Sequence, residues 1–167
     1  MGTTENLKAA FTGESEANRK YLAFATKAES EGFGQVAKLF RAVAEAETIH
    51  AHAHLRVLEG VKDTATNLAA AMEGEDYEFN VMYPEFIATA QAEGNKKAVR
   101  SMTHAMEVEK IHHDLFQQAL AAVKGGSDLD GELDIYVCPV CGHTEIGKAP
   151  DNCPICNVKG ERYLTIG

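Results

Sequence analysis

The sequence lacks several features that mark common protein classes. It has no tryptophan, and its 16 lysines and arginines are outnumbered by 25 aspartates and glutamates, which gives a formal net charge of -9. Nucleic acids and anionic membranes attract clustered positive charge, so neither is an expected partner. No run approaches the roughly 20 apolar residues of a transmembrane helix. Residues 1–5 show neither the basic nor the apolar part of a secretory signal, so we expect a cytoplasmic protein.

Cysteine is missing from most of the chain, because all four cysteines lie within residues 138–156. Disulfide frameworks usually extend over the chain that they cross-link. Two C-x-x-C pairs close together are instead typical of a tetrahedral thiolate site for zinc or for a single iron. Gly142 and Asn157, which follow the pairs, tolerate the positive φ that such a turn needs. The predicted thiolate ligands are Cys138, Cys141, Cys153 and Cys156.

The rest of the chain is dominated by helical periodicity. Apolar residues recur at three- and four-residue spacing in four segments, at about 4–30, 34–59, 64–93 and 96–124. Pro84 lies inside the third segment and is expected to kink it. Residues 127–132 are predicted to be a polar linker, and residues 133–167 contain short extended pieces at 135–137 and 162–166. We therefore expect an all-α four-helix bundle in residues 1–126 and a small β-rich metal module in residues 133–167.

The helical part contains an internal repeat. Leu7–Glu14 matches Leu68–Glu75, and Glu47–His50 matches Glu109–His112. The repeated unit is a whole helical hairpin, so the bundle is predicted to be a pseudo-two-fold pair of hairpins. A site for two metal ions fits naturally on such an axis.

Acidic residues interrupt the apolar stripe of every predicted helix at about mid-length. Buried carboxylates are unstable without a partner, and two divalent cations would neutralise the cluster. Glutamates from two helices, with Glu-x-x-His from each of the other two, form the ligand set of di-iron and di-manganese bundles. The alternative is a set of salt-bridged surface acids, which the in-register repeat disfavours. The predicted ligands are Glu14, Glu47, His50, Glu75, Glu78, Glu109 and His112.

Smaller irregularities occur at the same level. Gly13 and Gly74 each precede a ligand glutamate in mid-helix, which costs roughly 1 kcal/mol relative to alanine. Glu78 aligns with Ala17, so one hairpin offers a carboxylate that the other lacks. Tyr21 and Tyr83 are candidates for hydrogen bonds to the site, although ordinary core packing explains them equally well.

Taken together, these patterns resemble the rubrerythrin family over essentially the whole chain. The resemblance implies a ferritin-like di-iron bundle followed by a rubredoxin-like module. The residues that carry it are Gly13–Ser15, Glu47–His50, Gly74–Glu78, Met82–Phe86, Glu109–His112 and the two C-P-x-C pairs.

The resemblance also implies a role for each ligand. Terminal and bridging carboxylates would hold the two irons, with the terminal positions at Glu14 and Glu75 and the bridging positions at Glu47 and Glu109. His112 would complete one iron. The other iron would move between Glu78 when oxidised and His50 when reduced.

The activity implied by the resemblance is reduction of hydrogen peroxide to water. Electrons would come from rubredoxin or an NAD(P)H-dependent reductase through an iron held by the four cysteines. Two other functions stay open from the residues: an iron-storage bundle with a structural zinc ribbon, and a manganese enzyme such as a catalase.

The connection between the second and third helices restricts the topology. Residues 60–63 span at most roughly 15 Å, whereas a helix of about 26 residues is about 39 Å long. The chain therefore cannot make the long crossover of a ferritin-like bundle. Either the two helices form a plain hairpin, or the first hairpin packs on the second hairpin of a partner in a domain-swapped homodimer, which we favour.

Overall fold

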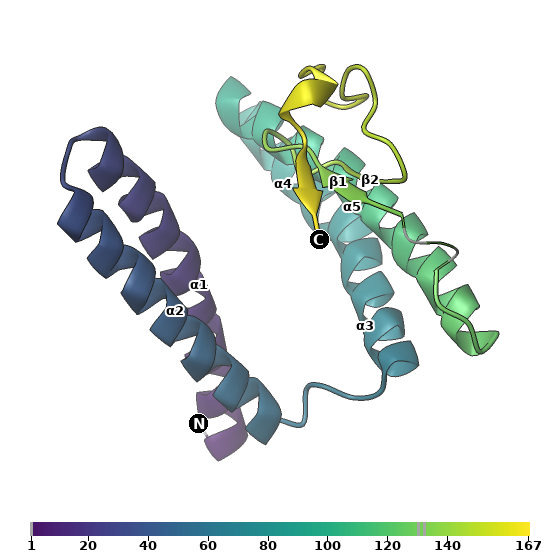
Figure 1. Ribbon diagram of the computed structural model, residues 1–167, viewed down its shortest axis with the longest axis horizontal. Helices are drawn as coiled ribbons and strands as arrows, with labels where there is room; N and C mark the ends of the chain where they lie inside the picture. The colour runs from purple at the N-terminus through teal and green to yellow at the C-terminus, as the bar shows by residue number, and fades with distance from the viewer. Residues whose placement is uncertain (1, 130, 132) are drawn as a thin grey trace. The chain divides into compact units, whose positions relative to one another are not determined.

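The structure is a computed structural model that describes residues 2–129, 131 and 133–167. It contains two compact units, the first ending at Lys62 and the second running from Asp63 to Gly167 (Figure 1). No helix in the described part of the chain is long and apolar enough to cross a membrane. The predicted linker at 127–132 includes residues 130 and 132, which lie outside the described residues.

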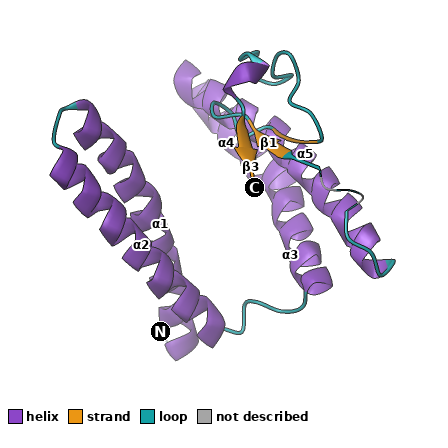
Figure 2. Ribbon diagram, in the orientation of Figure 1, coloured by secondary structure: helices purple, strands orange, loops and turns teal. Residues whose placement is uncertain are grey.

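The first unit is a hairpin of two long helices, α1 (Thr3–Ser30) and α2 (Gly34–Val57) (Figure 2). The apolar residues buried between the two helices are alanines. On α2 they recur every seventh residue, at Ala37, Ala44 and Ala51, which keeps them on one helix face. This spacing lets the two backbones approach closely.

Larger apolar side chains of this hairpin are left exposed. They come from both helices and include Leu22, Phe24, Val36, Leu39, Val43 and Ile49. Helices in proteins owe most of their stability to the packing of an apolar face. The hairpin therefore presents apolar surface that suits packing against further helices.

The second unit begins with helices that pack on one long partner. They are α3 (Thr64–Tyr77), the π-helical segment η1 (Glu78–Met82), α4 (Tyr83–Ala92) and α5 (Lys96–Lys124). Both α3 and α4 contact α5, where Ala90, Val108 and Leu120 are buried. The predicted four long helical segments are thus present, and the third is divided by η1.

The π-helical segment replaces the simple kink that Pro84 predicts. The Tyr83 N–H donates to the Glu78 carbonyl, five residues earlier. Proline has no N–H and cannot continue a regular α-helical ladder. A wider turn directly before it absorbs that interruption, and π-turns of this kind are frequent at functional sites.

The C-terminal module is a three-stranded antiparallel sheet with long loops. Its strands are β1 (Ile135–Val137), β2 (Thr144–Ile146) and β3 (Leu164–Ile166), in the order β2-β1-β3. The sequence predicts β1 and β3 but not β2. A small core of Cys138, Cys153 and Tyr163 lies beside the sheet. The expected fold class, a helical bundle chain with a β-rich four-cysteine module, is confirmed.

Side-chain caps fix the starts of two helices in the second unit. Asp63 accepts a hydrogen bond from the Thr66 N–H at 3.0 Å. Asn95 accepts one from the Ala98 N–H at 3.1 Å, directly after Gly94, whose φ is +69°. The Gly94–Asn95 pair therefore ends one helix and begins the next.

Replacing Asn95 with alanine should lower the stability of the protein by about 1 kcal/mol, because the first turn of α5 loses its acceptor. Urea unfolding of the metal-loaded protein measures the effect. Asn95→Asp keeps the acceptor and should unfold at or above the wild-type midpoint. Equal losses in both variants would contradict the capping role.

Candidate metal centres

The first unit brings together three of the predicted ligands. Glu14 comes from α1, and Glu47 and His50 come from α2, with one ligand atom from each within 4.8 Å of the others. His50 Nδ1 lies 3.3 Å from Glu47 Oε2 and 3.9 Å from Glu14 Oε2. We call these three residues the first half-site.

The second unit repeats this arrangement. Glu75 comes from α3, and Glu109 and His112 come from α5, again within 4.8 Å of one another. His112 Nδ1 lies 2.7 Å from Glu109 Oε2 and 3.8 Å from Glu75 Oε1. These residues form the second half-site. The internal repeat of the sequence is therefore also a repeat of ligand geometry.

The acids of each half-site shift one another's protonation. Burial and then the charge of Glu109 raise the pKa of Glu75 to about 7. In the first half-site a shared hydrogen bond raises the pKa of Glu14 and lowers that of Glu47. Two neighbouring carboxylates hold a proton between them because both cannot easily be ionised. A cation bound between the carboxylates would neutralise their charge, so that both could be ionised without the shared proton.

The donor sets fit metal ions. Oxygen and nitrogen ligands lie about 2.0–2.2 Å from a divalent metal, so two atoms bound to one ion are at most about 4.4 Å apart. The 4.8 Å limit within each half-site leaves only a few tenths of an ångström to close. Carboxylate with imidazole and no thiolate suits iron or manganese.

The two histidines differ in what holds their rings. His112 Nε2 lies 3.3 Å from the Gly142 carbonyl and 3.1 Å from Thr144 Oγ1, so the cysteine module contacts the second half-site directly. This contact leaves Nδ1 free to bind a metal and fixes the tautomer, as partners of metal-bound histidines commonly do. Within the described residues of the first unit, the hydrogen bonds and ion pairs of the His50 ring involve Nδ1 alone.

Of three further predicted site residues, Glu78 and Tyr83 lie near the second half-site, whereas Tyr21 belongs to an aromatic cluster. Burial and the charge of Glu109 raise the pKa of Glu78, the first residue of η1. Burial and the charge of Glu78 raise the pKa of Tyr83, which places its hydroxyl among the acids of the second unit. Tyr21 packs its ring 6.2 Å from that of Phe40, in an aromatic cluster of the first hairpin. The catalytic roles of these residues stay predictions.

The mid-helix glycines have no packing reason within the described chain. A Cβ built at Gly13 or Gly74 would meet no atom within 4 Å. Their position next to a ligand glutamate is therefore a feature of the sequence that contacts within the described residues do not explain.

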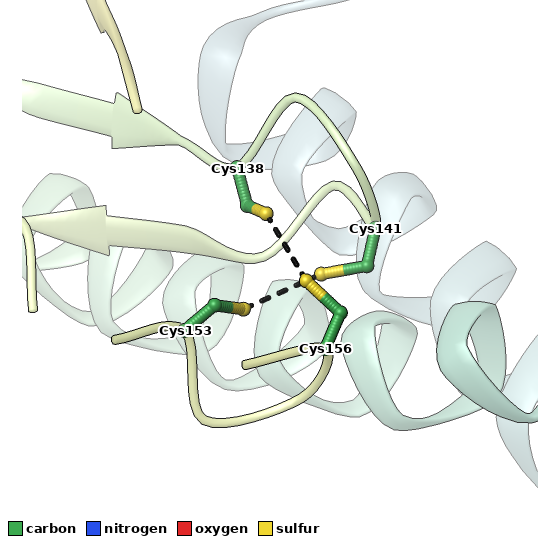
Figure 3. Close-up of side chains that lie close together, drawn as sticks. All are labelled: Cys138, Cys141, Cys153 and Cys156. Carbon is green, nitrogen blue, oxygen red and sulfur yellow. Dashed lines mark hydrogen bonds between the residues drawn. The ribbon is translucent and has the colours of Figure 1, made fainter. Parts of the chain in front are cut away.

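The four cysteines converge on one point in the C-terminal module (Figure 3). Cys138 Sγ lies 3.6 Å from Cys156 Sγ, and Cys141 Sγ lies 3.5 Å from Cys153 Sγ. A tetrahedral metal with bonds of about 2.3 Å to sulfur would place the sulfurs about 3.8 Å apart. The thiols therefore stand close to the geometry of a single tetrahedral ion.

Two equivalent turns shape this thiolate site. The Cys138 N–H donates to the His143 carbonyl at 2.8 Å, and the Cys153 N–H donates to the Val158 carbonyl at 2.7 Å. Gly142 and Asn157 have φ of +87° and +61°, which confirms the prediction of positive φ after each pair. The turns direct the backbone N–H groups of His143 and Val158 at the sulfurs of Cys141 and Cys156, which stabilises thiolates.

Comparisons with known proteins agree with both kinds of site. The rubrerythrin family profile matches residues 5–120, and the profile of the rubrerythrin rubredoxin-like domain matches residues 136–163. Rubrerythrin-2 of Clostridium acetobutylicum is 36% identical over 176 aligned positions, in an alignment that covers 96% of this chain and 95% of that protein. Nigerythrin of Nitratidesulfovibrio vulgaris is 40% identical over 170 aligned positions, in an alignment that covers 92% of this chain and 81% of that protein.

A solved structure of nigerythrin in a partially reduced state aligns with a TM-score of 0.60 at 34% identity, over 99% of this chain and 88% of that chain. The fold and the sites together define a helical carboxylate–histidine metalloprotein with an attached four-thiolate module. The chain belongs to the rubrerythrin family, and its sites are the di-iron site and the rubredoxin-like four-cysteine site of that family.

The raised pKa of Glu75 predicts an unusual pH dependence for the metal-free protein. The pKa of Glu75 is about 7 in the folded state against an ordinary value of 4.5 for a glutamate, so the folded state binds more protons than the unfolded state between these values. Stability should therefore fall as the pH rises through this range and stay low above it. Urea unfolding of metal-free protein between about pH 5 and pH 8 measures the effect.

Glu75→Gln should remove part of that fall, whereas Glu73→Gln, an exposed position on the same helix, should not. An identical pH dependence in Glu75→Gln and the wild type would contradict the prediction. Metal-loaded protein should show the opposite trend, because a cation competes with the proton for Glu75.

Proposed function

We propose that this protein is a non-haem di-iron peroxidase that reduces hydrogen peroxide to water, with electrons relayed through an iron in the four-cysteine site. The observation that carries the proposal is the contact of His112 with Gly142. One ring nitrogen of His112 faces the acids of the second half-site, and the other lies 3.3 Å from the carbonyl of the residue after Cys141. A storage protein with a structural zinc ribbon would not need this contact.

The contact supplies a short path for electrons. From Cys141 the path follows the backbone to the Gly142 carbonyl, crosses one hydrogen bond and enters the imidazole of His112. Thr144 also donates to the Gly142 carbonyl at 3.1 Å, which holds that oxygen in place. The same hydrogen bonds orient the His112 ring toward the half-site.

Side chains around the second half-site would donate protons and hydrogen bonds during the reaction. Iron bound in the two half-sites would supply Lewis acidity and two electrons for cleavage of the O–O bond. Glu78 is half-buried and holds its proton more readily than an exposed glutamate, since burial raises its pKa. In this proposal Glu78 delivers a proton to the departing oxygen, and Tyr83 is a second hydrogen-bond donor to the site.

The family resemblance implies that one iron moves between Glu78 and His50, and the local structure around both residues agrees with such an exchange. Glu78 begins the π-helical segment η1, where the hydrogen-bond ladder changes its spacing, so its backbone is less regular than that of Glu75. Within its own unit the His50 ring is held at Nδ1, whereas both ring nitrogens of His112 have partners. We therefore propose that Glu78 and His50 are the exchangeable ligands and that His112 is a permanent one.

The relatives support iron and electron transfer. One solved structure of nigerythrin represents a fully reduced, all-ferrous state, so the iron of that protein can be reduced. By analogy, we propose that rubredoxin or an NAD(P)H-dependent reductase supplies electrons here. The four free thiols of this chain would persist in the reducing cytoplasm, where we place the protein.

Glu78→Ala should leave iron bound but slow peroxide reduction by 10²- to 10⁴-fold, roughly the contribution of one general acid. The assay follows peroxide-dependent NADH oxidation with a rubredoxin-type reductase, and the iron content is measured on the same preparation. Glu85→Ala, an exposed acid on the neighbouring helix α4, is the matched control. Unchanged turnover in Glu78→Ala would reject its role, and a colourless protein with zinc at the cysteines would reject the electron relay.

We further propose that each two-metal site forms between two copies of the chain. The first unit holds three of the predicted bundle ligands and the second unit holds four, whereas six to seven together are needed for two ions. The connection from Val57 to Thr64 spans at most about 24 Å, whereas α2, with 24 residues, is about 36 Å long. The first hairpin of one copy would therefore pack its exposed apolar face on the second unit of another copy.

Mixing two defective copies tests this exchange. One copy carries Glu47→Ala in the first half-site, and the other carries Glu109→Ala in the second. In a domain-swapped heterodimer one of the two sites combines the intact half-sites, so random pairing restores about a quarter of the sites. Activity should return on co-expression and should be lacking when either copy is expressed alone. No recovery, with heterodimers demonstrated by differential tags, would contradict the exchange.

A further inference from the structure

A buried asparagine lies one helical turn from the first half-site. Asn18 is 6% exposed and follows Glu14 by four residues on α1, so the two side chains share a helix face. The other buried residues of α1 and α2 are alanines. A polar side chain in such a contact is costly unless its hydrogen bonds are satisfied, so its partners show what it does there.

The Asn18 amide joins α1 to α2 through a small hydrogen-bond network. Asn18 Nδ2 donates to the Ala44 carbonyl at 2.6 Å and to Thr48 Oγ1 at 2.8 Å. Thr48 Oγ1 donates to the same Ala44 carbonyl at 3.2 Å. Arg19 Nε donates to Asn18 Oδ1 at 2.8 Å, which orients the amide, because its oxygen only accepts and its nitrogen only donates. We call these contacts the Asn18 network, and both ends of the amide have partners in it.

The Asn18 network connects the chain segments that carry the two carboxylates of the first half-site. Glu14 lies one turn before Asn18, and Glu47 directly precedes Thr48. In coiled coils a single buried asparagine fixes the register of neighbouring helices, and the hydrogen bonds of Asn18 resist sliding of α1 along α2 in the same way. The network therefore sets how Glu14 and Glu47 face each other.

The second hairpin shows that a helical hairpin of this kind does not itself require the network. Phe79 lies four residues after Glu75, and Lys110 follows Glu109, and these two side chains cannot form an amide–hydroxyl pair. In the second unit the cysteine module instead holds the ring of His112. Each half-site is thus supported in its own way: through its histidine in the second unit, and through the helices that carry its carboxylates in the first.

We propose that Asn18 and Thr48 are positioning residues of the di-iron site, which hold Glu14 and Glu47 at a fixed separation while His50 binds or leaves the metal. The inference rests on the proposed ligand roles of the two glutamates and on the proposed exchange of His50. A half-site whose histidine exchanges needs its carboxylates to be held by something other than that histidine. The Asn18 network does this from the helix backbone, without occupying either carboxylate.

The test measures how tightly the full chain binds Mn²⁺, whose free form is quantified by electron paramagnetic resonance. Carboxylate and imidazole suit Mn²⁺, and the four-cysteine site is filled with zinc beforehand. Asn18→Leu should weaken binding about 10- to 100-fold, the usual effect of losing a group that orients a metal ligand. Thr48→Val, which replaces the hydroxyl with a methyl group, should also weaken binding. Thr48→Ser keeps the hydroxyl and should bind Mn²⁺ like the wild type.

Ala37→Gly is the matched control for helix packing. Ala37 is 0% exposed in the same contact and lies ten residues before Glu47, which is roughly 15 Å along the helix. Glycine disfavours the helix, so the urea midpoint of the metal-free protein should fall while the affinity for Mn²⁺ stays at the wild-type value. Equal losses of affinity in Ala37→Gly and Asn18→Leu would show a general packing effect and would overturn the inference.

Glu47→Ala separates the inference from the ligand assignment on which it rests. This variant removes a proposed ligand and should bind Mn²⁺ more weakly than Asn18→Leu does. Weak binding in Glu47→Ala with wild-type binding in both Asn18→Leu and Thr48→Val would leave the ligand assignment intact and overturn the positioning role. Wild-type binding in Glu47→Ala would refute the ligand assignment, and the inference with it. Thr48→Ser that binds as weakly as Thr48→Val would show that the hydroxyl is not what positions the site.

Discussion

Mutual repulsion between neighbouring carboxylates is the constraint on which the rest of this structure depends. Each half-site holds two glutamates and a histidine with ligand atoms within 4.8 Å, and in each the acids must share a proton when no cation is present. In the second half-site, burial and then the charge of Glu109 raise the pKa of Glu75 to about 7. Helices that are otherwise regular thus carry groups that are most stable when metal ions neutralise them, and the iron of the rubrerythrin family supplies that charge.

Much of the site follows from the sequence because helix geometry is local. Three-residue spacing places Glu109 and His112 on one helix face whatever surrounds them, and the repeat doubles this signal at Glu47 and His50. The cysteine turns are local in the same sense: positive φ at Gly142 and Asn157 follows from a loop that must bring two thiols to one ion. The clustering of these side chains was therefore predictable residue by residue, and so was the fold class, while the role of each residue as a metal ligand stays a prediction.

Other features depend on segments that meet only in the folded chain. Pro84 predicted an irregularity in the third helical segment. Both a kink and a π-turn accommodate the N–H that proline lacks, so the sequence could not distinguish between them. Strand β2 is three residues long and is specified by its pairing with β1 more than by its composition. The contacts of His112 with Gly142 and of Tyr163 with His143 join residues 30 and 20 positions apart, and no spacing rule links them.

The contact between His112 and Gly142 makes the two units unequal. The second unit combines a half-site, the extra carboxylate Glu78 and the cysteine module, and His112 joins them through Gly142. The first unit contributes a half-site whose histidine, within that unit, is held at Nδ1. A ligand that leaves the metal during turnover must not be held by other partners, whereas a ligand on the electron path must keep its orientation in every cycle. In the proposed mechanism this difference explains why a duplicated hairpin has two unequal histidines: the cysteine module packs against one copy of the repeat and holds the ring of His112 there.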